Sequence, residues 1–273
     1  MVSVKQGKVD ALEILSADEN LRKKMSNLFG KSSRNRDFYF YSIFSIITAI
    51  LLILFYYVDE EFYSWFADED GLAENLSAVF FFFTGLILLL KSLREIKKGM
   101  KFRKEVLFIL LGIGFLFAAG EEISWGQRIF NIPTSEFLMK YNAQQEITSH
   151  NLFFFHTSLY NPNTITDVFV FVMGIVIPVC CFFMNRFRNY LKKFNFPVIQ
   201  ISFLPIFLMG LIYGLVMVQI THHHPFAPNE IKEFIYSVGF LLYSISAITS
   251  SRLKRSPEHH DRGRKYGCYG SEK

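Results

Sequence analysis

The feature that most constrains the fold is a series of six apolar segments, each close to the length of a membrane-crossing helix. A helix needs about 20 mostly apolar residues to cross a hydrocarbon core roughly 30 Å thick. A soluble domain of 273 residues does not repeat such segments. The second segment is short, and we expect it to begin nearer Ala73. The six predicted spans are Phe38–Val58, Ser77–Leu90, Val106–Phe130, Ile165–Met184, Val198–Ile220 and Ile231–Ser250.

The basic residues lie in alternate connections between these segments. Of the 29 Lys and Arg residues, 26 fall in the N-terminal tail to Asp37, the loops 91–104 and 185–196, and the tail after Ser251. The remaining three are Arg128, Lys140 and Lys232. The positive-inside rule places the basic connections and both termini in the cytoplasm. The sequence therefore predicts an all-α, polytopic integral membrane protein with six transmembrane helices.

This topology sets the expected organisation, location and partners. We expect a cytoplasmic tail over 1–36, a membrane domain over 37–251 and a disordered cytoplasmic tail over 252–273. The membrane is the plasma (inner) membrane if the source is bacterial. Because topology explains the formal charge of +5, membrane lipids are expected partners and nucleic acid is not. No cysteine falls on the predicted outer side, so no disulfide or cysteine-based zinc site is expected there.

The third segment ends in a dense polar motif that begins with two adjacent carboxylates, Glu121 and Glu122. The helical rise from Lys104 places Glu121 about 25 Å along the axis, near the far membrane surface. A carboxylate in that zone usually faces a bundle interior or a wet cavity. Glu121, Trp125 and Arg128 are spaced i, i+4, i+7, so they share a helix face. The alternative to a functional site is a structural Glu121–Arg128 pair that fixes the helix end.

The same helix face carries small residues further into the membrane. Gly114 and Ala118 lie on that stripe, and small residues let a neighbouring helix approach closely. We therefore expect this face, with Glu121, to point into the bundle. Gly210 and Gly214 form a second small-residue pair, which predicts close helix contact. The run from Thr164 to Asp167 predicts a capping box that opens the fourth helix.

The predicted outer side also gathers most of the histidines. On a helix, Glu146 and His150 are spaced i, i+4. This spacing allows the two side chains to bind one cation, and it equally allows the carboxylate to orient the imidazole. Of the adjacent His222–His224, at most two can bind one ion, and His222 or His223 is preferred. Glu233 continues inward through Ser237 and Ser244, a polar stripe that suggests a cavity wall.

These residues predict a membrane-embedded hydrolase or transferase that acts on a lipid or lipid-linked substrate at the outer surface. A glutamate acts as general base in this hypothesis. The predicted catalytic residues are Glu121, Glu122, Arg128 and His150. The predicted substrate-binding residues are Ser124, Trp125, Gln127, Gln145 and Asn151. A divalent metal, with zinc favoured, is expected on Glu146, His150, His222, His223 and Glu233.

Two other classes compete with the enzyme. A transport or binding protein for protons, metal ions or a small solute needs polar residues through the membrane centre. Few lie that deep, namely Thr84, Gln200, Ser202, Tyr213, Ser244 and Ser246. A structural assembly subunit needs only a rigid polar network. The enzyme hypothesis requires the loop after Asn131, with short helices over Ser135–Met139 and Gln144–Phe155, to fold back over the bundle.

Overall fold

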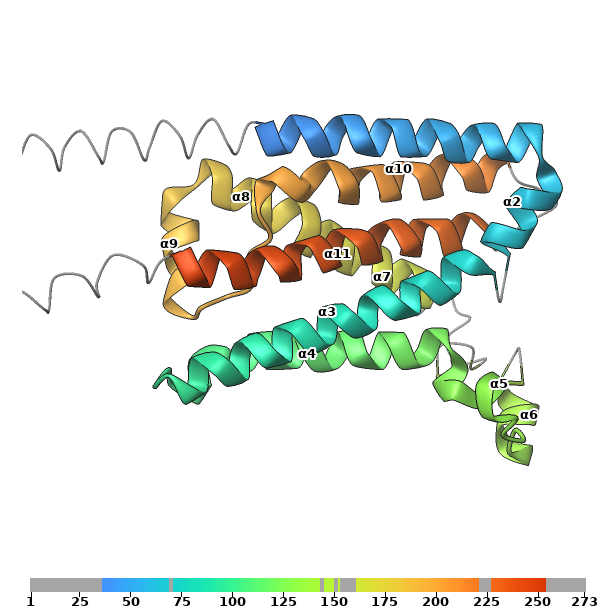
Figure 1. The fold of residues 1–273 in the computed structure, drawn as a ribbon, viewed down its shortest axis with the longest axis horizontal. Helices are drawn as coiled ribbons and strands as arrows, with labels where there is room; N and C mark the ends of the chain where they lie inside the picture. The colour runs from blue at the N-terminus through green and yellow to red at the C-terminus, as the bar shows by residue number, and fades with distance from the viewer. Residues whose placement is uncertain are drawn as a thin grey trace, which may run out of the picture.

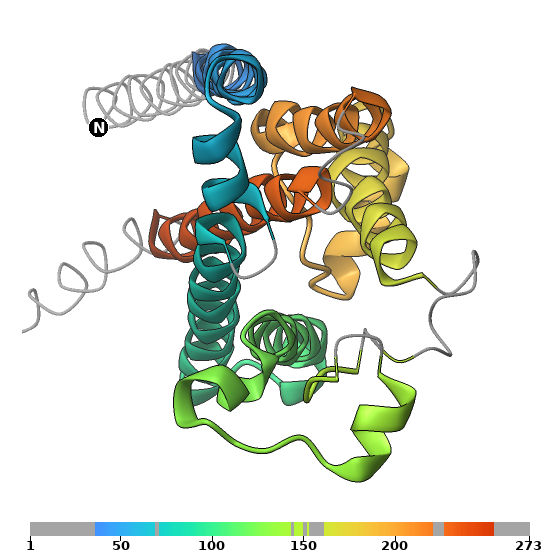
Figure 2. The ribbon, with the colours of Figure 1, turned by 90° about the vertical axis from the view of Figure 1, so that its right-hand side faces the viewer.

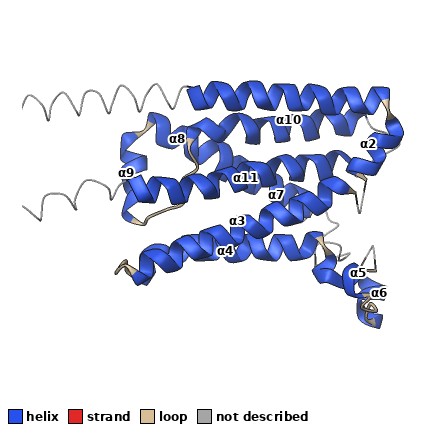
Figure 3. Cartoon of the chain, in the orientation of Figure 1, coloured by secondary structure: helices blue, strands red, loops and turns tan. Residues whose placement is uncertain are grey.

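The structure, a computed structural model, describes residues 36–68, 71–142, 145–149, 152, 161–220 and 227–253. This part of the chain is helical, and no strand occurs in it (Figure 3). Five stretches are long and apolar enough to cross a membrane: Arg36–Val58, Glu61–Lys97, Pro162–Phe183, Ile201–Ile220 and Ala227–Thr249. The all-α class of the prediction is therefore confirmed for the described residues, and five of its six segments correspond to these stretches.

The helices lie side by side as a bundle, and both ends of the described chain are at the same end of it (Figure 1). After Arg36–Val58 come α2 (Glu60–Ala67), α3 (Leu72–Lys97) and α4 (Phe102–Glu122). The connection after α4 holds η1 (Ser124–Gly126), α5 (Gln127–Phe130) and α6 (Glu136–Tyr141). The second half comprises α7 (Pro162–Val170), the π-helical turn η3 (Phe171–Val176), α8 (Ile177–Phe183), α9 (Asn185–Lys193), η4 (Ile201–Phe203), α10 (Leu204–Ile220) and α11 (Ala227–Leu253).

The third predicted span, Val106–Phe130, is too long. Its helix, α4, begins at Phe102 and ends at Glu122. Charged residues stand at both ends, so the charge-free part of α4 runs only from Val106 to Gly120, and α4 is not among the five spanning stretches. It nevertheless runs antiparallel along α3, joined by a tight turn in which Gly99 has φ 93°. The sixth span and the cytoplasmic position of both ends stay predictions.

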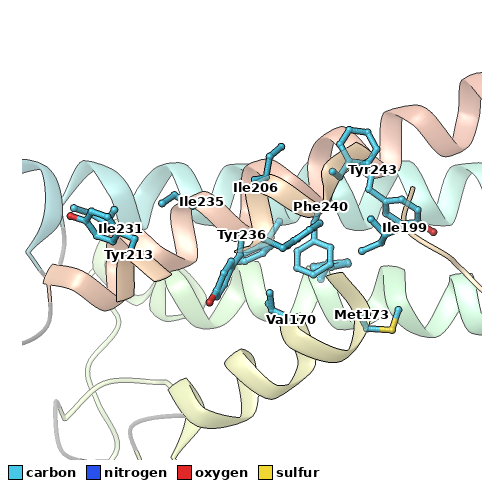
Figure 4. Close-up of a cluster of buried hydrophobic side chains, with 14 of the residues drawn as sticks. Val170, Met173, Ile199, Ile206, Tyr213, Ile231, Ile235, Tyr236, Phe240 and Tyr243 are labelled. Atoms are coloured by element: carbon cyan, nitrogen blue, oxygen red, sulfur yellow. The ribbon is translucent and has the colours of Figure 1, made fainter. Parts of the chain in front are cut away.

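A single apolar core joins α3, α4, the α7–η3 segment, α10 and α11. Aromatic rings are its main components: the Phe115 and Phe240 ring centroids are 4.7 Å apart, and Phe207 lies 4.9 Å from Phe240. In Figure 4, Tyr236 and Phe240 extend from α11 beside Val170 and Met173 of the α7–η3 segment. Helix α11 therefore stands at the centre of the bundle and connects its two halves.

The predicted close contact at Gly210 and Gly214 is confirmed. A Cβ built on Gly210 would lie 2.5 Å from the Tyr236 ring, and one on Gly214 would lie 2.7 Å from the Lys232 side chain. Helix α10 therefore approaches α11 along its glycine face. The corresponding prediction for Gly114 is wrong, because a Cβ there would meet no atom within 4 Å. On α4, Gly114 borders open space, whereas Gly112 packs against Gly85 and Leu89 of α3.

The predicted capping box at Thr164–Asp167 is also wrong. Helix α7 begins three residues earlier, with Pro162 at its first position and the Asn161 side chain accepting from the Asn163 amide. Proline suits the first helical position because its missing N–H would have no partner there anyway. Asp167 consequently lies inside the helix, where its carboxylate is available for tertiary contacts.

Candidate functional site: a carboxyl pair at an apolar cavity

The polar motif at the end of α4 begins with a break in the helix. Ser124, Trp125 and Gly126 have φ values of 48°, 53° and 78°, in the left-handed region that L side chains seldom adopt. The break turns the Trp125 ring back over Gly120, where a Cβ would lie 2.9 Å from the ring. The Trp125 Nε1–H then donates to Glu121 Oε1 at 2.7 Å. The predicted Glu121–Trp125 pairing exists, but a turn creates it instead of a continuous helix.

The second oxygen of Glu121 anchors the loop that follows α6. Glu121 Oε2 accepts from the backbone N–H of Ser149 at 2.7 Å and from its hydroxyl at 2.8 Å. The Glu121 side chain is buried, with 7% of the residue exposed. Its burial is stabilised because both carboxylate oxygens accept hydrogen bonds. Glu121 therefore connects the end of α4 to the loop 28 positions later in the sequence.

Further hydrogen bonds hold the same loop. The Ser124 hydroxyl donates to the Glu146 carboxylate. The side-chain amide of Gln127 makes two hydrogen bonds, each of 2.6 Å: its Oε1 accepts from the Ile147 N–H, and its Nε2 donates to Thr134 Oγ1. Thr134 in turn donates to the Gln145 carbonyl at 2.6 Å. We call this set the loop network; its predicted site residues are Glu121, Ser124, Trp125, Gln127, Gln145 and Glu146.

The loop network brings together residues for which sequence analysis predicted three different roles. The loop does fold back onto the end of α4, as the enzyme hypothesis requires, but α6 has no buried residue. The short helix predicted over Ser135–Met139 is confirmed as α6, one residue later at its start, and does not lie on the bundle. Of the helix predicted over Gln144–Phe155, the described residues 145–149 are not helical.

Glu122 faces a different environment from its neighbour Glu121. It lines a cavity of about 520 Å³ between α4 on one side and α7, η3 and α11 on the other. Figure 2 shows the ribbons of α4, in green, and α7, in yellow. The wall is almost entirely apolar, and Gly114 and Ala118 belong to the part that α4 contributes. Gly114 thus borders the cavity instead of a neighbouring helix.

The carboxyl groups of Glu122 and Glu233 lie close to each other at one end of this cavity. An ionised carboxylate is an acceptor without a donor, so two carboxyl groups this close hydrogen-bond to each other only when one of them carries a proton. Glu230 and Glu74 lie close enough to add negative charge at this position. Among the described residues that line the cavity, Glu122 and Glu233 are the charged ones.

A charged network that sequence analysis missed borders the carboxyl pair. The Lys232 ammonium, on a residue 3% exposed, lies 3.1 Å from the Asp167 carboxylate and also donates to Asn229 Oδ1 at 3.2 Å. The Tyr236 hydroxyl, which belongs to the cavity wall, donates to the same carboxylate at 3.0 Å. The network connects α11 to α7. No local sequence pattern indicates it, because Lys232 and Tyr236 are 65 and 69 positions from Asp167.

The predicted polar stripe on α11 extends less far than expected. Glu233 lines the cavity, but Ser237 and Ser244 do not. Each donates to a carbonyl of its own helix, Ser237 to Phe234 at 2.7 Å and Ser244 to Leu241 at 2.8 Å. These hydroxyls are fully buried and already paired. The part of the stripe beyond Glu233 therefore belongs to the helix interior, and the prediction of a polar cavity wall there is wrong.

The remaining predicted site residues lie outside the described part of the chain: His150, Asn151, His222, His223 and the side chain of Arg128. Their convergence with the glutamates, the Glu121–Arg128 pair and the metal site that includes them stay predictions. Among the residues that the structure describes, no group of three His, Cys, Asp or Glu side chains could hold a metal ion. The two metal-ligand candidates that are described, Glu146 and Glu233, make separate contacts in the loop network and the carboxyl pair.

The helices are compatible with one broad class, a multi-pass membrane protein. Comparison with protein-family models, with curated proteins and with solved structures gives no match. The function therefore has to be inferred from the chemistry of the cavity and its carboxyl pair.

Proposed function

We propose that the protein is a membrane-embedded hydrolase or transferase, and that Glu122 and Glu233 are its catalytic residues. The observation that carries the proposal is the position of the carboxyl pair at one end of an apolar cavity inside a helical bundle. The apolar wall suits the hydrocarbon part of a lipid or lipid-linked substrate. Carboxyl groups inside a bundle are costly, and such residues usually mark functional positions.

A pair that shares one proton can act as general base and general acid together. In hydrolysis of an ester, the ionised carboxylate takes a proton from water while the water oxygen bonds to the acyl carbon. The other carboxyl gives its proton to the leaving oxygen as the old C–O bond breaks. The pair ends with one proton again, on the opposite glutamate. With an acceptor hydroxyl in place of water, the same steps transfer the acyl group.

Glu121 has a supporting role in this proposal. Its oxygens bind Trp125 and Ser149, so the loop network secures the end of α4 and thereby the direction of Glu122. A divalent metal on Glu233 and the predicted histidines is a second form of the proposal. Metal analysis of the purified wild-type protein and of the Glu233→Gln and His150→Ala variants distinguishes the two forms. Bound metal that both substitutions remove would favour the metal-dependent form.

The proposed test measures lipid conversion. Purified protein in nanodiscs is incubated with a panel of lipid esters and amides, and the products are identified by mass spectrometry. We expect Glu122→Gln and Glu233→Gln each to reduce the rate by roughly 10²–10⁴-fold, the usual contribution of general acid–base catalysis. Glu136→Gln, an exposed change in α6, is the matched control and should leave the rate unchanged.

Two outcomes would overturn the enzyme proposal. One is full activity in both glutamine variants of the pair. The other is lipid binding without conversion by the folded wild-type protein, which would favour the alternative class of binding or transport protein. Ion transport has less support than catalysis. The hydroxyls of Ser237 and Ser244, deep in the bundle, already donate hydrogen bonds to carbonyls of their own helix.

A further inference from the structure

A strongly basic surface lies at the end of the bundle away from the carboxyl pair, and the proposed function does not use it. Helix α9 carries four cationic side chains and no carboxylate. Figure 1 places α9 at the same end of the bundle as the turn between α3 and α4, and the residues around the start of α4 add three more cations. These seven exposed side chains, which we call the basic surface, are Lys101, Arg103, Lys104, Arg186, Arg188, Lys192 and Lys193.

Asn195 joins the two parts of the basic surface. Its backbone N–H donates to the Lys192 carbonyl at 3.2 Å, and its side-chain amide donates to the Lys104 carbonyl at 3.1 Å. Asn195 has φ 51°, a left-handed conformation that asparagine adopts more readily than most residues. The end of α9 and the start of α4 are therefore neighbours, although Asn195 and Lys104 are 91 positions apart in the sequence.

A buried ion pair fixes this junction. The Asn195 amide also donates to Glu105 Oε1 at 2.9 Å, and Glu105 Oε2 accepts from Lys91 of α3 at 3.0 Å. Both charged residues are buried, and the Lys91 ammonium lies 3.3 Å from the centroid of the Phe108 ring. A buried polar network whose members are paired is rigid. The two basic segments are thus held in fixed relative positions, and the charge of Glu105 is matched by Lys91.

The charges of the basic surface itself are not matched by carboxylates of the described residues. None of the seven side chains forms an ion pair there, and Arg188 donates instead to the neutral Asn185 side chain at 2.6 Å. Like charges that are gathered in one place create a potential that attracts anions. The surface therefore fits a partner that carries negative charge.

Exposed aromatic rings among the cations indicate which anion fits. Phe183, Tyr190 and Phe194 are exposed in and beside α9, and Phe102 is exposed at the start of α4. Helix α9 begins two residues after the end of Pro162–Phe183, a stretch apolar and long enough to cross a membrane. An amphipathic helix with basic and aromatic side chains lies at the boundary between lipid head groups and acyl chains. This combination favours a lipid over a soluble anion.

We propose that the basic surface binds an anionic phospholipid of the leaflet at this end of the bundle. Its phosphate lies among the cations of α9 and the start of α4, and its acyl chains lie along the exposed rings. Each lysine or arginine near a membrane surface strengthens the attraction to anionic lipid roughly fivefold. The inference is independent of the proposed chemistry, because the basic surface and Glu122 lie at opposite ends of α4.

Native mass spectrometry of the full-length protein, freed of lipid in detergent, tests the inference. Phosphatidylglycerol and phosphatidylcholine with the same acyl chains are titrated, and their dissociation constants are compared. We expect the wild-type protein to bind phosphatidylglycerol at least roughly tenfold more tightly. The preference should weaken as the ammonium acetate concentration rises, because salt screens exposed charges. Equal affinity for the two lipids would overturn the inference.

Two double variants separate the charges from the rings. Lys192→Gln/Lys193→Gln should weaken phosphatidylglycerol binding roughly tenfold or more and leave phosphatidylcholine binding unchanged. Phe183→Ser/Phe194→Ser should weaken the binding of both lipids by a similar factor and keep the preference. Lys140→Gln, an exposed change in α6 at the other end of the bundle, is the matched control and should alter neither. A full preference in the lysine variant would contradict the assigned surface.

Asn195→Gly tests whether α9 and the start of α4 form one site. Glycine adopts a φ of 51° without strain and leaves all seven cations in place, but it loses the bonds to Lys104 and Glu105. The preference for phosphatidylglycerol should fall at least roughly threefold. An unchanged preference in the folded variant would refute a single site built from both segments.

Soluble competitors decide between a lipid and other anions. Glycerol phosphate and a polyglutamate peptide, each in large excess, should not displace bound phosphatidylglycerol, because neither supplies acyl chains to the aromatic rings. Displacement by glycerol phosphate would make the ligand a free phosphate compound, and displacement by the peptide would make it an acidic protein segment. Either result would overturn the assignment to a lipid.

Discussion

At the scale of single residues, adjacent carboxylates have separate roles because neighbours on a helix point about 100° apart. Glu121 turns to the connection after α4, where Trp125 and Ser149 donate to its oxygens. Glu122 turns to the cavity and meets Glu233 from α11. Glu121 and Glu122 therefore do not form one site: Glu121 holds a loop, and Glu122 faces the cavity. Lys232 is buried beside Asp167, which matches its charge.

The Asp167–Lys232 pair gives a prediction about stability. Asp167→Ala leaves the Lys232 ammonium buried without its carboxylate and should lower the free energy of unfolding by about 3 kcal/mol, the lower end of the range for a broken buried pair because Asp167 is 37% exposed. The double variant Asp167→Ala/Lys232→Met should lose less than the two single variants added together. Unfolding in detergent micelles measures all of them. Strict additivity would mean that the two charges are not coupled.

A control for this cycle comes from a pair at the end of α3 in which only the lysine is exposed. Lys98 and Glu95 approach to 3.7 Å, but the Lys98 side chain is 54% exposed. Surface pairs contribute little because water and salt screen them. Lys98→Ala should therefore change the free energy of unfolding by less than about 1 kcal/mol.

At the scale of helices, glycine has opposite functions on α10 and α4. Gly210 lets α10 approach Tyr236 of α11, so there the missing side chain creates a contact. Gly114 faces the cavity, so there the missing side chain leaves space. The two positions have similar sequence surroundings, a glycine within an apolar helix. What distinguishes them is whether a second helix lies opposite.

This difference predicts opposite effects of the same substitution. Gly210→Ala places a Cβ 2.5 Å from the Tyr236 ring and should destabilise the protein by roughly 1–3 kcal/mol. Gly114→Ala meets no atom and should stabilise it by about 0.4–1 kcal/mol, since alanine has less freedom to lose on folding. Thermal unfolding in one detergent compares them directly. A destabilising Gly114→Ala would show that this part of α4 is packed.

At the scale of the whole molecule, α4 decides the number of membrane crossings. Five stretches are long and apolar enough to span, whereas α4 has charged residues at both ends. It packs along α3 and runs beside the other helices (Figure 1). If it spans, the basic connections all lie on one side, as the positive-inside rule predicts.

Cysteine labelling tests this topology. In a protein with its three natural cysteines replaced, Gly99→Cys and Lys140→Cys flank α4 at exposed positions. An impermeant thiol reagent should label position 140 in intact cells, and position 99 only after the membrane is opened. Asn189→Cys, in α9, should behave like position 99. Labelling of positions 99 and 140 from the same side would remove α4 from the set of spans.

The sequence by itself determined the helical class and the positions of the apolar segments, because the hydrocarbon core sets a length and a composition that every span must satisfy. It also indicated Glu122 and Glu233 as candidate site residues, since carboxylates next to a span are costly. It could not show that these two meet, that Glu121 binds Ser149, or that Gly114 borders a cavity. Those facts depend on which faces of distant helices lie opposite each other, and only the tertiary structure decides that, because each contact joins residues that no local pattern relates.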